Sequence, residues 1–200
     1  MKIAVILLRW ALNFIYFFMK LAPCDNNRVV FLSRQSNTPT DDFLMLKAKL
    51  EEIKPDIKIV MFTQRVDGNL KSMLSYGVTT LKSMHHLARA RVCVLDAYWP
   101  AVSMLKHKDS LAVMQMWHAM GKIKKSGYQS VGKEFGRSSM LAHELRMHRN
   151  YDVIIAGGKA FDPFYCASFG VDESVLYNVG LPRMEMLREN TEKCRKQFFE

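Results

Sequence analysis

The sequence predicts an α/β domain in which helices flank a parallel β-sheet. Short β-branched runs alternate with helical or polar stretches after Pro23, which is the pattern of such a sheet. Apolar residues make up 49% of the 200 residues, enough to bury one sizeable core. Because no Ser/Gly-rich linker or repeat interrupts residues 24–183, we expect them to form one domain.

Six strands are expected, and each is a short run rich in Val, Ile or Leu. The runs are Val29–Leu32, Ile57–Phe62, Val92–Leu95, Ala112–Trp117, Val153–Ala156 and Val175–Val179. A helix is expected from Asp41 or Asp42, either of which can cap it, through Glu52. Another begins at Asp162-Pro163 and stops at Gly170. Residues 184–200 are charged and helical, and we expect them to lead to a second domain.

The chain is strongly basic, with a formal net charge of +10 and a pI near 9.5. This charge indicates an anionic partner, and phosphorylated small molecules, nucleic acid and an acidic membrane surface all qualify. Cys24, Cys93, Cys166 and Cys194 form no C-x-x-C pair and no His/Cys cluster at metal-ligand spacing. We therefore expect reduced thiols in a cytosolic protein, and neither a metal site nor a cofactor.

Residues 1–23 are predicted to form an amphipathic helix that lies on a membrane surface. Its polar residues are spaced by seven, four and seven positions, so they share one helical face, and aromatic and aliphatic side chains cover the rest. The polar residues are Lys2, Arg9, Asn13 and Lys20. The expected membrane contacts are Lys2, Arg9, Trp10, Phe14, Phe17, Phe18 and Lys20.

Two other interpretations of this helix stay open. The apolar run from Ile3 to Ala22 is long enough to cross a bilayer or to serve as a secretory signal, although Arg9 interrupts it. The helix is also compatible with a core position against another domain.

The segment from Gln115 to Lys125 has the strongest chemical character. An apolar strand delivers Trp117 and His118 to its carboxyl end, where ligands bind in open α/β sheets. An imidazole there can act as a general base, while Gly121 and the lysines after it allow close backbone approach and attract phosphate. The alternative is structural: a histidine packed on a tryptophan, followed by a solvated lysine turn.

This segment, Trp117-His118-Ala119-Met120-Gly121, resembles the W-H-A-x-G or W-H-G-T-P motif of the CDP-glycerol glycerophosphotransferases, which make wall teichoic acid polymers. Leu95-Asp96-Ala97-Tyr98-Trp99-Pro100 resembles the strand and turn upstream of that motif. Val179-Gly180-Leu181-Pro182-Arg183 resembles the family's G-x-P-R signature. The three segments occur in the family's order, and the similarity extends from about Phe31 to Arg183.

The resemblance implies the amino-terminal, acceptor-side half of a GT-B architecture, with a Rossmann-like sheet. A second domain, absent from this chain, would bind the CDP-polyol. His118 would deprotonate an acceptor hydroxyl that attacks the donor β-phosphate and expels CMP. The other implied substrate contacts are Trp117, Gly121, Lys122, Lys124, Lys125, Arg137 and Arg183.

Ala119, Met120 and Gly121 replace the commoner Gly-Thr-Pro, which leaves the acceptor and polyol open. His143 and His148 are interpreted as surface or helix histidines. The implied partners are a CDP-polyol, a lipid-linked acceptor and the cytoplasmic face of an anionic plasma membrane; self-association stays open. A GT-B glycosyltransferase and a non-catalytic binding module are the alternatives. No nucleic acid is expected, because the aromatic residues do not interleave with basic ones.

Overall fold

The computed structural model describes residues 2–67, 69–119, 121, 124–134 and 136–199. Its centre is a six-stranded sheet with the order β2-β1-β3-β4-β5-β6, and all five neighbouring pairs are parallel. The strands are β1 Asp25–Ser33, β2 Lys58–Thr63, β3 Ala90–Leu95, β4 Ala112–Gln115, β5 Val153–Ile155 and β6 Leu176–Tyr177. Strand order reverses between β1 and β3, which is where open α/β sheets bind ligands.

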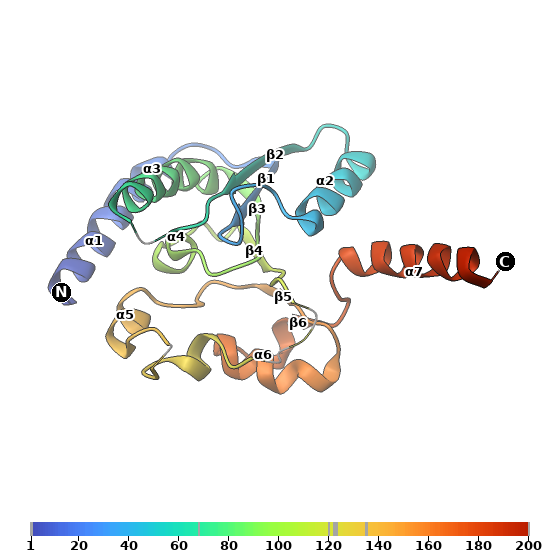
Figure 1. Ribbon diagram of the computed structural model, residues 1–200. Coiled ribbons are helices and arrows are strands. Elements are labelled where there is room, and N and C mark those ends of the chain that lie inside the picture. The colour runs from blue at the N-terminus through green and yellow to red at the C-terminus, as the bar shows by residue number, and fades with distance from the viewer. Residues whose placement is uncertain (1, 68, 120, 122–123, 135, 200) are drawn as a thin grey trace.

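Helices cover both faces of this sheet (Figure 1). They are α1 Lys2–Met19, α2 Asp41–Ile53, α3 Leu70–Leu87, α4 Pro100–Met104, α5 Ser139–Glu144, α6 Asp162–Phe169 and α7 Arg183–Phe199. The predicted α/β class is confirmed. Helix α7 projects away from the sheet.

Strand alternation divides the core into two layers. On one face, Val30 and Leu32 of β1 pack with Met84 of α3, Trp99 and Tyr165 of α6. On the other face, Val29 and Phe31 pack with Phe43 of α2, and the Phe31 and Phe43 rings meet edge to face at 4.9 Å. Successive strand residues point to opposite faces, so the near-continuous apolar runs are those of a sheet buried on both sides.

The predicted strand positions are confirmed, although several strand ends are shorter than predicted, most of all in β4 and β6. Strand β4 stops at Gln115 instead of Trp117, because Trp117 has a left-handed φ of 62° that cannot continue a strand. Strand β6 is only Leu176–Tyr177, since residues 173–175 form a 3₁₀ turn capped by the Asp172 side chain.

Helix α2 begins at Asp41, as predicted, but its N-cap residue is not the predicted one. Thr40 is the N-cap residue and makes no side-chain cap hydrogen bond, whereas the Asp42 carboxylate is buried in a contact with Arg183. Helix α6 ends as predicted at Gly170, which is left-handed and donates its N–H to the Cys166 carbonyl over 2.7 Å.

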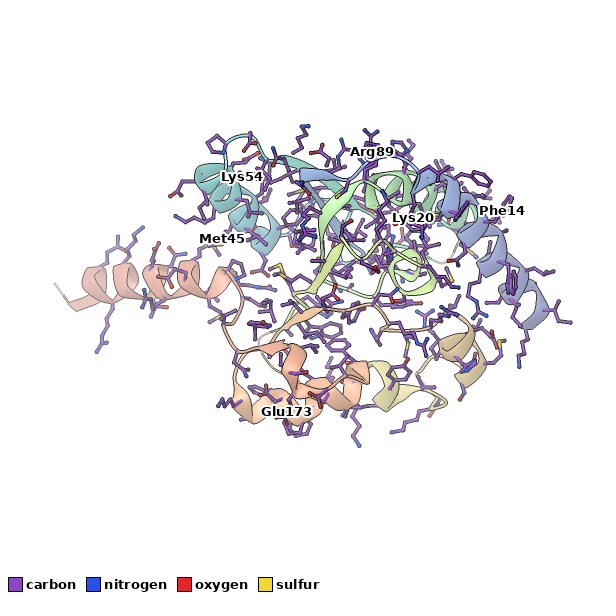
Figure 2. All side chains as sticks on the ribbon, turned by 180° about the vertical axis from the view of Figure 1, so that it is seen from behind. Phe14, Lys20, Met45, Lys54, Arg89 and Glu173 are labelled. Carbon is purple, nitrogen blue, oxygen red and sulfur yellow. The ribbon has the colours of Figure 1, made fainter. Side chains whose placement is uncertain are left out.

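Helix α1 is docked through its polar face. The Arg9 guanidinium donates to the Glu144 backbone carbonyl at 2.7 Å and lies 3.3 Å from its carboxylate. Asn13 donates to the Met104 carbonyl at 3.0 Å and accepts from the Lys106 N–H at 2.9 Å. The polar stripe therefore faces the protein, and the apolar side of α1 is turned outward, as Phe14 shows in Figure 2.

Candidate active site

His118 lies just past the carboxyl end of β4 and is held by the end of β3. Its Nδ1 is 2.9 Å from the Asp96 backbone carbonyl. A carbonyl only accepts, so Nδ1 carries the proton of the neutral ring and Nε2 carries the lone pair. The atom of the Gln35 side-chain amide that lies 3.1 Å from the same Nδ1 is its nitrogen. An Nδ1–H donor requires the amide turned by 180°, so that its oxygen takes this place. This tautomer is the one that a base acting through Nε2 requires.

Trp117 turns the chain so that His118 reaches this position. Its φ of 62° is a conformation that bulky residues rarely adopt and that costs about 1–3 kcal/mol. The Gln115 side chain accepts its N–H at 2.9 Å. The Trp117 ring lies 4.0 Å from the His118 ring and meets the Phe169 ring edge to face at 5.4 Å. Trp117 is therefore a wall of the site that also fixes the imidazole plane.

An open cleft of about 420 Å³ surrounds His118, and we call it the His118 cleft. Its lining is basic and aromatic, and among the described residues no Asp or Glu lines it. The lining residues are Arg34, Gln35, Arg65, Val66, Ala97, Tyr98, Trp117, His118, Gly127, Ser130, Gly136, Arg137, Met147 and His148. A positive, partly apolar cleft of this kind suits a phosphorylated ligand.

Behind His118, Asp96 is a buried carboxyl that is 2% exposed. Burial raises the pKa of Asp96 to about 6, and the Ser33 hydroxyl, which donates to Oδ2 at 2.6 Å, partly opposes the rise. Within the described part of the chain, Oδ1 makes no hydrogen bond. Asp96 therefore orients the imidazole through its backbone carbonyl, while its side chain changes charge in the weakly acidic range.

Arg183 supports the His118 turn from the other side. Its Nη2 donates to the His118 carbonyl at 2.9 Å and lies 2.7 Å from the Asp42 carboxylate. Its backbone N–H donates to the same carboxylate at 2.9 Å. Arg183 was predicted to touch substrate, but its guanidinium is engaged with the protein and does not line the cleft. The substrate contact stays a prediction, and the observed contacts give Arg183 a role in positioning the loop of His118.

The predicted residues after His118 have mixed outcomes. Arg137 lines the cleft, 5.1 Å above the Tyr98 ring. Lys124 and Lys125 are exposed and do not line it, and Lys122 lies outside the described residues. Gly121 packs beneath Phe161, where a Cβ would come within 2.7 Å of the ring. Its small size therefore serves packing on the protein.

Several cleft residues escaped the sequence prediction. Arg34, Arg65 and Tyr98 come within three residues of the ends of β1, β2 and β3, so the rule that ligands bind at carboxyl strand ends gives a usable signal for them. His148 was interpreted as a surface or helix histidine, and this is wrong: it is 6% exposed, has a φ of 61° and lines the cleft. No local pattern indicates that position. His143 is exposed, as predicted.

The α1 residues divide between the two faces of the helix. Trp10, Phe14, Phe17 and Phe18 are 54–71% exposed. Lys2 is exposed at the helix start, and the Lys20 amine lies 5.8 Å over the Tyr16 ring. Arg9 points inward to Glu144, so it is not available on the outer face as the sequence suggested. By length and composition, α1 is the one helix among the described residues that could cross a membrane.

The fold and the site define a class of protein. It is a parallel α/β domain with a histidine at the carboxyl edge of its sheet and, around that histidine, a basic cleft that suits a phosphorylated ligand. Residues 14–198 match the family model described as CDP-Glycerol:Poly(glycerophosphate) glycerophosphotransferase. The chain belongs to this family.

Two curated relatives come from Bacillus spizizenii. The teichoic acid ribitol-phosphate primase is 32% identical over 166 residues, covering 82% of this chain and 42% of the relative. The teichoic acid poly(ribitol-phosphate) polymerase is 26% identical over 183 residues, covering 91% and 28%. The matched region therefore spans less than half the length of either relative.

Among solved structures, the wall teichoic acid polymerase TagF has a similar fold. One TagF structure, soaked with CDPG, superposes with a TM-score of 0.67 at 15% identity, covering 98% of this chain and 51% of that one. At this identity the likeness concerns the fold, and it agrees with the expected half of a GT-B architecture.

Proposed function

We propose that this chain is the acceptor-side part of an enzyme that transfers polyol phosphate from a CDP-activated donor to a lipid-linked acceptor in teichoic acid synthesis. The observation that carries the proposal is the Nδ1 contact of His118 with the Asp96 carbonyl, which places the basic nitrogen of the neutral imidazole at Nε2 beside a basic cleft. Family membership and the two Bacillus relatives support the reaction class.

In the proposed reaction, His118 Nε2 accepts the proton of an acceptor hydroxyl. The hydroxyl oxygen forms a bond to the β-phosphorus of the CDP-polyol, and the bond from that phosphorus to the bridging oxygen breaks. CMP leaves with the electron pair. Transfer of this kind depends chiefly on positioning and on stabilising charge. The chain supplies both through the Asp96 and Arg183 contacts and through the arginines of the His118 cleft.

The donor would bind to a further domain, to which α7 leads. The relatives are more than twice as long as the matched region, which supports this division. A CDP-polyol would then face the His118 cleft from the opposite side. The 200-residue chain is therefore expected to release no CMP alone.

The test measures acceptor-dependent CMP release by the enzyme extended through its donor domain, with CDP-glycerol and CDP-ribitol as alternative donors. His118→Ala should lower kcat by at least 100-fold, the low end of what a positioned base contributes. His143→Ala is the matched control at an exposed histidine and should retain activity. Full activity without His118, or no release from either donor, would refute the proposal; a sugar transferred instead would favour the glycosyltransferase.

The apolar face of α1 is proposed to lie in the cytoplasmic leaflet of the plasma membrane. Trp10 and Phe14 project from this face, while Lys106 and Arg146 line a groove beside them. Apolar insertion combined with nearby cations is how interfacial helices bind anionic bilayers. The Arg9–Glu144 contact favours a helix that stays docked on its domain, because a spanning helix would have to break it.

Vesicle flotation of the chain checks this orientation. Trp10→Ala/Phe14→Ala should reduce binding to phosphatidylglycerol-containing vesicles by more than tenfold, because each aromatic ring buries apolar area worth about 1.5–3 kcal/mol. Leu44→Ala/Ile53→Ala is the control, since these side chains are also exposed but lie on α2, across the sheet. Equal losses in the two variants would exclude the proposed face.

A further inference from the structure

A basic groove lies between α1 and the segment that contains α5, apart from the His118 cleft. It consists of two pockets of about 350 and 330 Å³, and the Arg9 and Arg146 side chains line both of them. We call the two pockets together the α1–α5 groove. No described residue lines both this groove and the His118 cleft. A ligand in the groove would therefore occupy a site other than the one proposed for the reaction.

The two pockets differ in chemical character. The first is walled by the rings of Trp10 and Phe14, which are 71% and 67% exposed on the outer side of α1. The second adds polar side chains, which are those of Tyr128, Ser139, His143 and Arg149. Because Arg9 and Arg146 line both pockets, the groove suits a molecule with an apolar end, a central anion and a polar end.

The groove carries positive charge that the protein does not neutralise. Among the described residues, no Asp or Glu lines either pocket. Arg9 is paired with Glu144 at 3.3 Å, but none of the described ion pairs includes Lys106, Arg146 or Arg149. Burial, followed by the charges of Arg9 and Arg149, lowers the pKa of the Arg146 guanidinium. A bound anion would relieve this repulsion between like charges.

Arg146 also occupies a backbone position at which glycine is usual. Helix α5 ends in a Schellman motif, because the Arg146 N–H donates to the His143 carbonyl at 3.0 Å and the Met147 N–H donates to the Ala142 carbonyl at 2.9 Å. The first of these donors is left-handed, and Arg146 has a φ of 49°. Glycine adopts this conformation without strain. A strained arginine beside like charges indicates that its side chain serves binding rather than stability.

We propose that the α1–α5 groove binds one anionic phospholipid of the bilayer, with its phosphate between Arg9 and Arg146, its acyl chains along Trp10 and Phe14, and its polar headgroup in the second pocket. A guanidinium suits phosphate oxygens. The inference rests on the membrane orientation proposed for α1 and adds a discrete lipid site to it. A lipid held there would fix the rotation of the domain about α1, which an apolar helix face alone leaves free.

Calorimetric titration of the chain with short-chain lipids that stay monomeric in solution tests the site without a membrane. Dihexanoyl-phosphatidylglycerol should bind with one-to-one stoichiometry. Dihexanoyl-phosphatidylcholine should bind at least tenfold more weakly, because its choline cation would meet Arg149 and Arg146. Inorganic phosphate should also bind at least tenfold more weakly, because it has no acyl chains to bury against the aromatic rings.

Arg146→Gly separates binding from folding. This variant should weaken phosphatidylglycerol binding at least tenfold, yet raise the thermal unfolding midpoint by about 2–4 °C, because glycine accepts the left-handed conformation and one like charge is removed. Lys54→Gln is the matched control. It removes one charge from an exposed lysine at the end of α2, distant from Phe14 in Figure 2, and it should change neither quantity.

Equal affinity for the two lipids, for the glycerol lipid and inorganic phosphate, or for wild type and Arg146→Gly would overturn the inference. The lipid end of the acceptor shares the chemistry of a hydrocarbon joined to phosphate, so geranyl phosphate is a further probe. Tighter binding of geranyl phosphate than of the phosphatidylglycerol would assign the groove to the acceptor and refute the proposal. Lipid binding lost in Arg137→Gln would place the lipid in the His118 cleft, with the same consequence.

This titration needs no donor, no turnover and no vesicle, so its outcome is separate from CMP release and from vesicle flotation. Vesicle binding through Trp10 and Phe14 without binding of the monomeric lipid would refute only this inference. Binding of the monomeric lipid without vesicle binding would refute only the proposed orientation of α1.

Discussion

Arg183 joins the turn of His118 to the start of helix α2. One nitrogen, Nη2, lies 2.9 Å from the His118 carbonyl and 2.7 Å from the Asp42 carboxylate. Asp42 is 3% exposed, so this contact is a buried one. The final segment of the domain thereby fixes the position of the proposed base, 65 residues earlier in the chain.

Breaking this contact should destabilise the domain and loosen His118. We expect Arg183→Gln to lower the free energy of unfolding by about 2 kcal/mol, because it leaves a buried carboxylate unpaired while the guanidinium is partly solvated. Urea unfolding measures the loss, and the side-chain nitrogen resonances of His118 report the loosening. Lys47→Gln breaks an exposed pair with Glu51 and should cost about 0.5 kcal/mol or less. Equal costs would contradict the assignment.

Asp96 should make stability fall as pH rises through the weakly acidic range. Its pKa in the fold is about 6, above its ordinary value, because burial disfavours the charged form. The stability contribution of the neutral carboxyl is therefore fully present below about pH 4 and is lost as pH rises from 4 to 6, by roughly 2–3 kcal/mol. Asp96→Asn should abolish this component. Unfolding at pH 4, 6 and 8 tests the difference between variant and wild type, and parallel profiles would disprove it.

His107 should act in the opposite direction. Its Nε2 donates to the Val102 carbonyl and its Nδ1 accepts from the Tyr16 hydroxyl, both at 2.8 Å. Burial lowers the pKa of His107 to about 4, so stability is present above pH 6.5 and is lost as pH falls to 4, by about 3 kcal/mol.

His107→Gln, which keeps a donor for Val102, should flatten this acid limb. The same bond also fastens α1 to its domain through Tyr16, which is 1% exposed. Tyr16→Phe should therefore cost about 1–3 kcal/mol at pH 7. An unchanged midpoint in Tyr16→Phe would show that the hydroxyl does not hold α1.

Gly127 should tolerate no side chain. Its φ is +56°, and a Cβ would approach the Ser168 backbone oxygen to 2.1 Å. Gly127→Ala should lower stability by about 2 kcal/mol or more and weaken anion binding in the cleft that it lines. Gly77→Ala is the control: it lies inside α3 with nothing within 4 Å, and it should stabilise by about 0.5–1 kcal/mol. Thermal unfolding compares them, and similar shifts would contradict the packing argument.

The cleft shows how far local pattern extends. His118 and Arg137 were expected at the site, and both line it. Arg34 and Arg65 belong to the same edge, but each follows its strand without a motif. Their meeting depends on β1 and β2 being neighbours, a fact that no local window contains.

In helix α1 the sequence pattern was interpreted correctly, but the surface that it contacts was not. Its periodicity identified the polar stripe correctly, but Lys2, Arg9 and Lys20 of that stripe were expected to contact a membrane surface. In the structure Arg9 meets Glu144, 135 residues away, and Asn13 meets Met104. Periodicity specifies which residues share a face, but it does not specify what covers that face.

The amino-acid pattern thus established the α/β class, the strand positions, the basic charge and the histidine at a strand end, because each is encoded in neighbouring residues. Long-range packing established the rest. It places the Asp96 carbonyl that selects the His118 tautomer, the Arg183 guanidinium that bonds to the His118 carbonyl, and the inward face of α1. These contacts join residues 22 to 135 positions apart. Their existence follows from strand order and helix docking, which are properties of the whole folded chain.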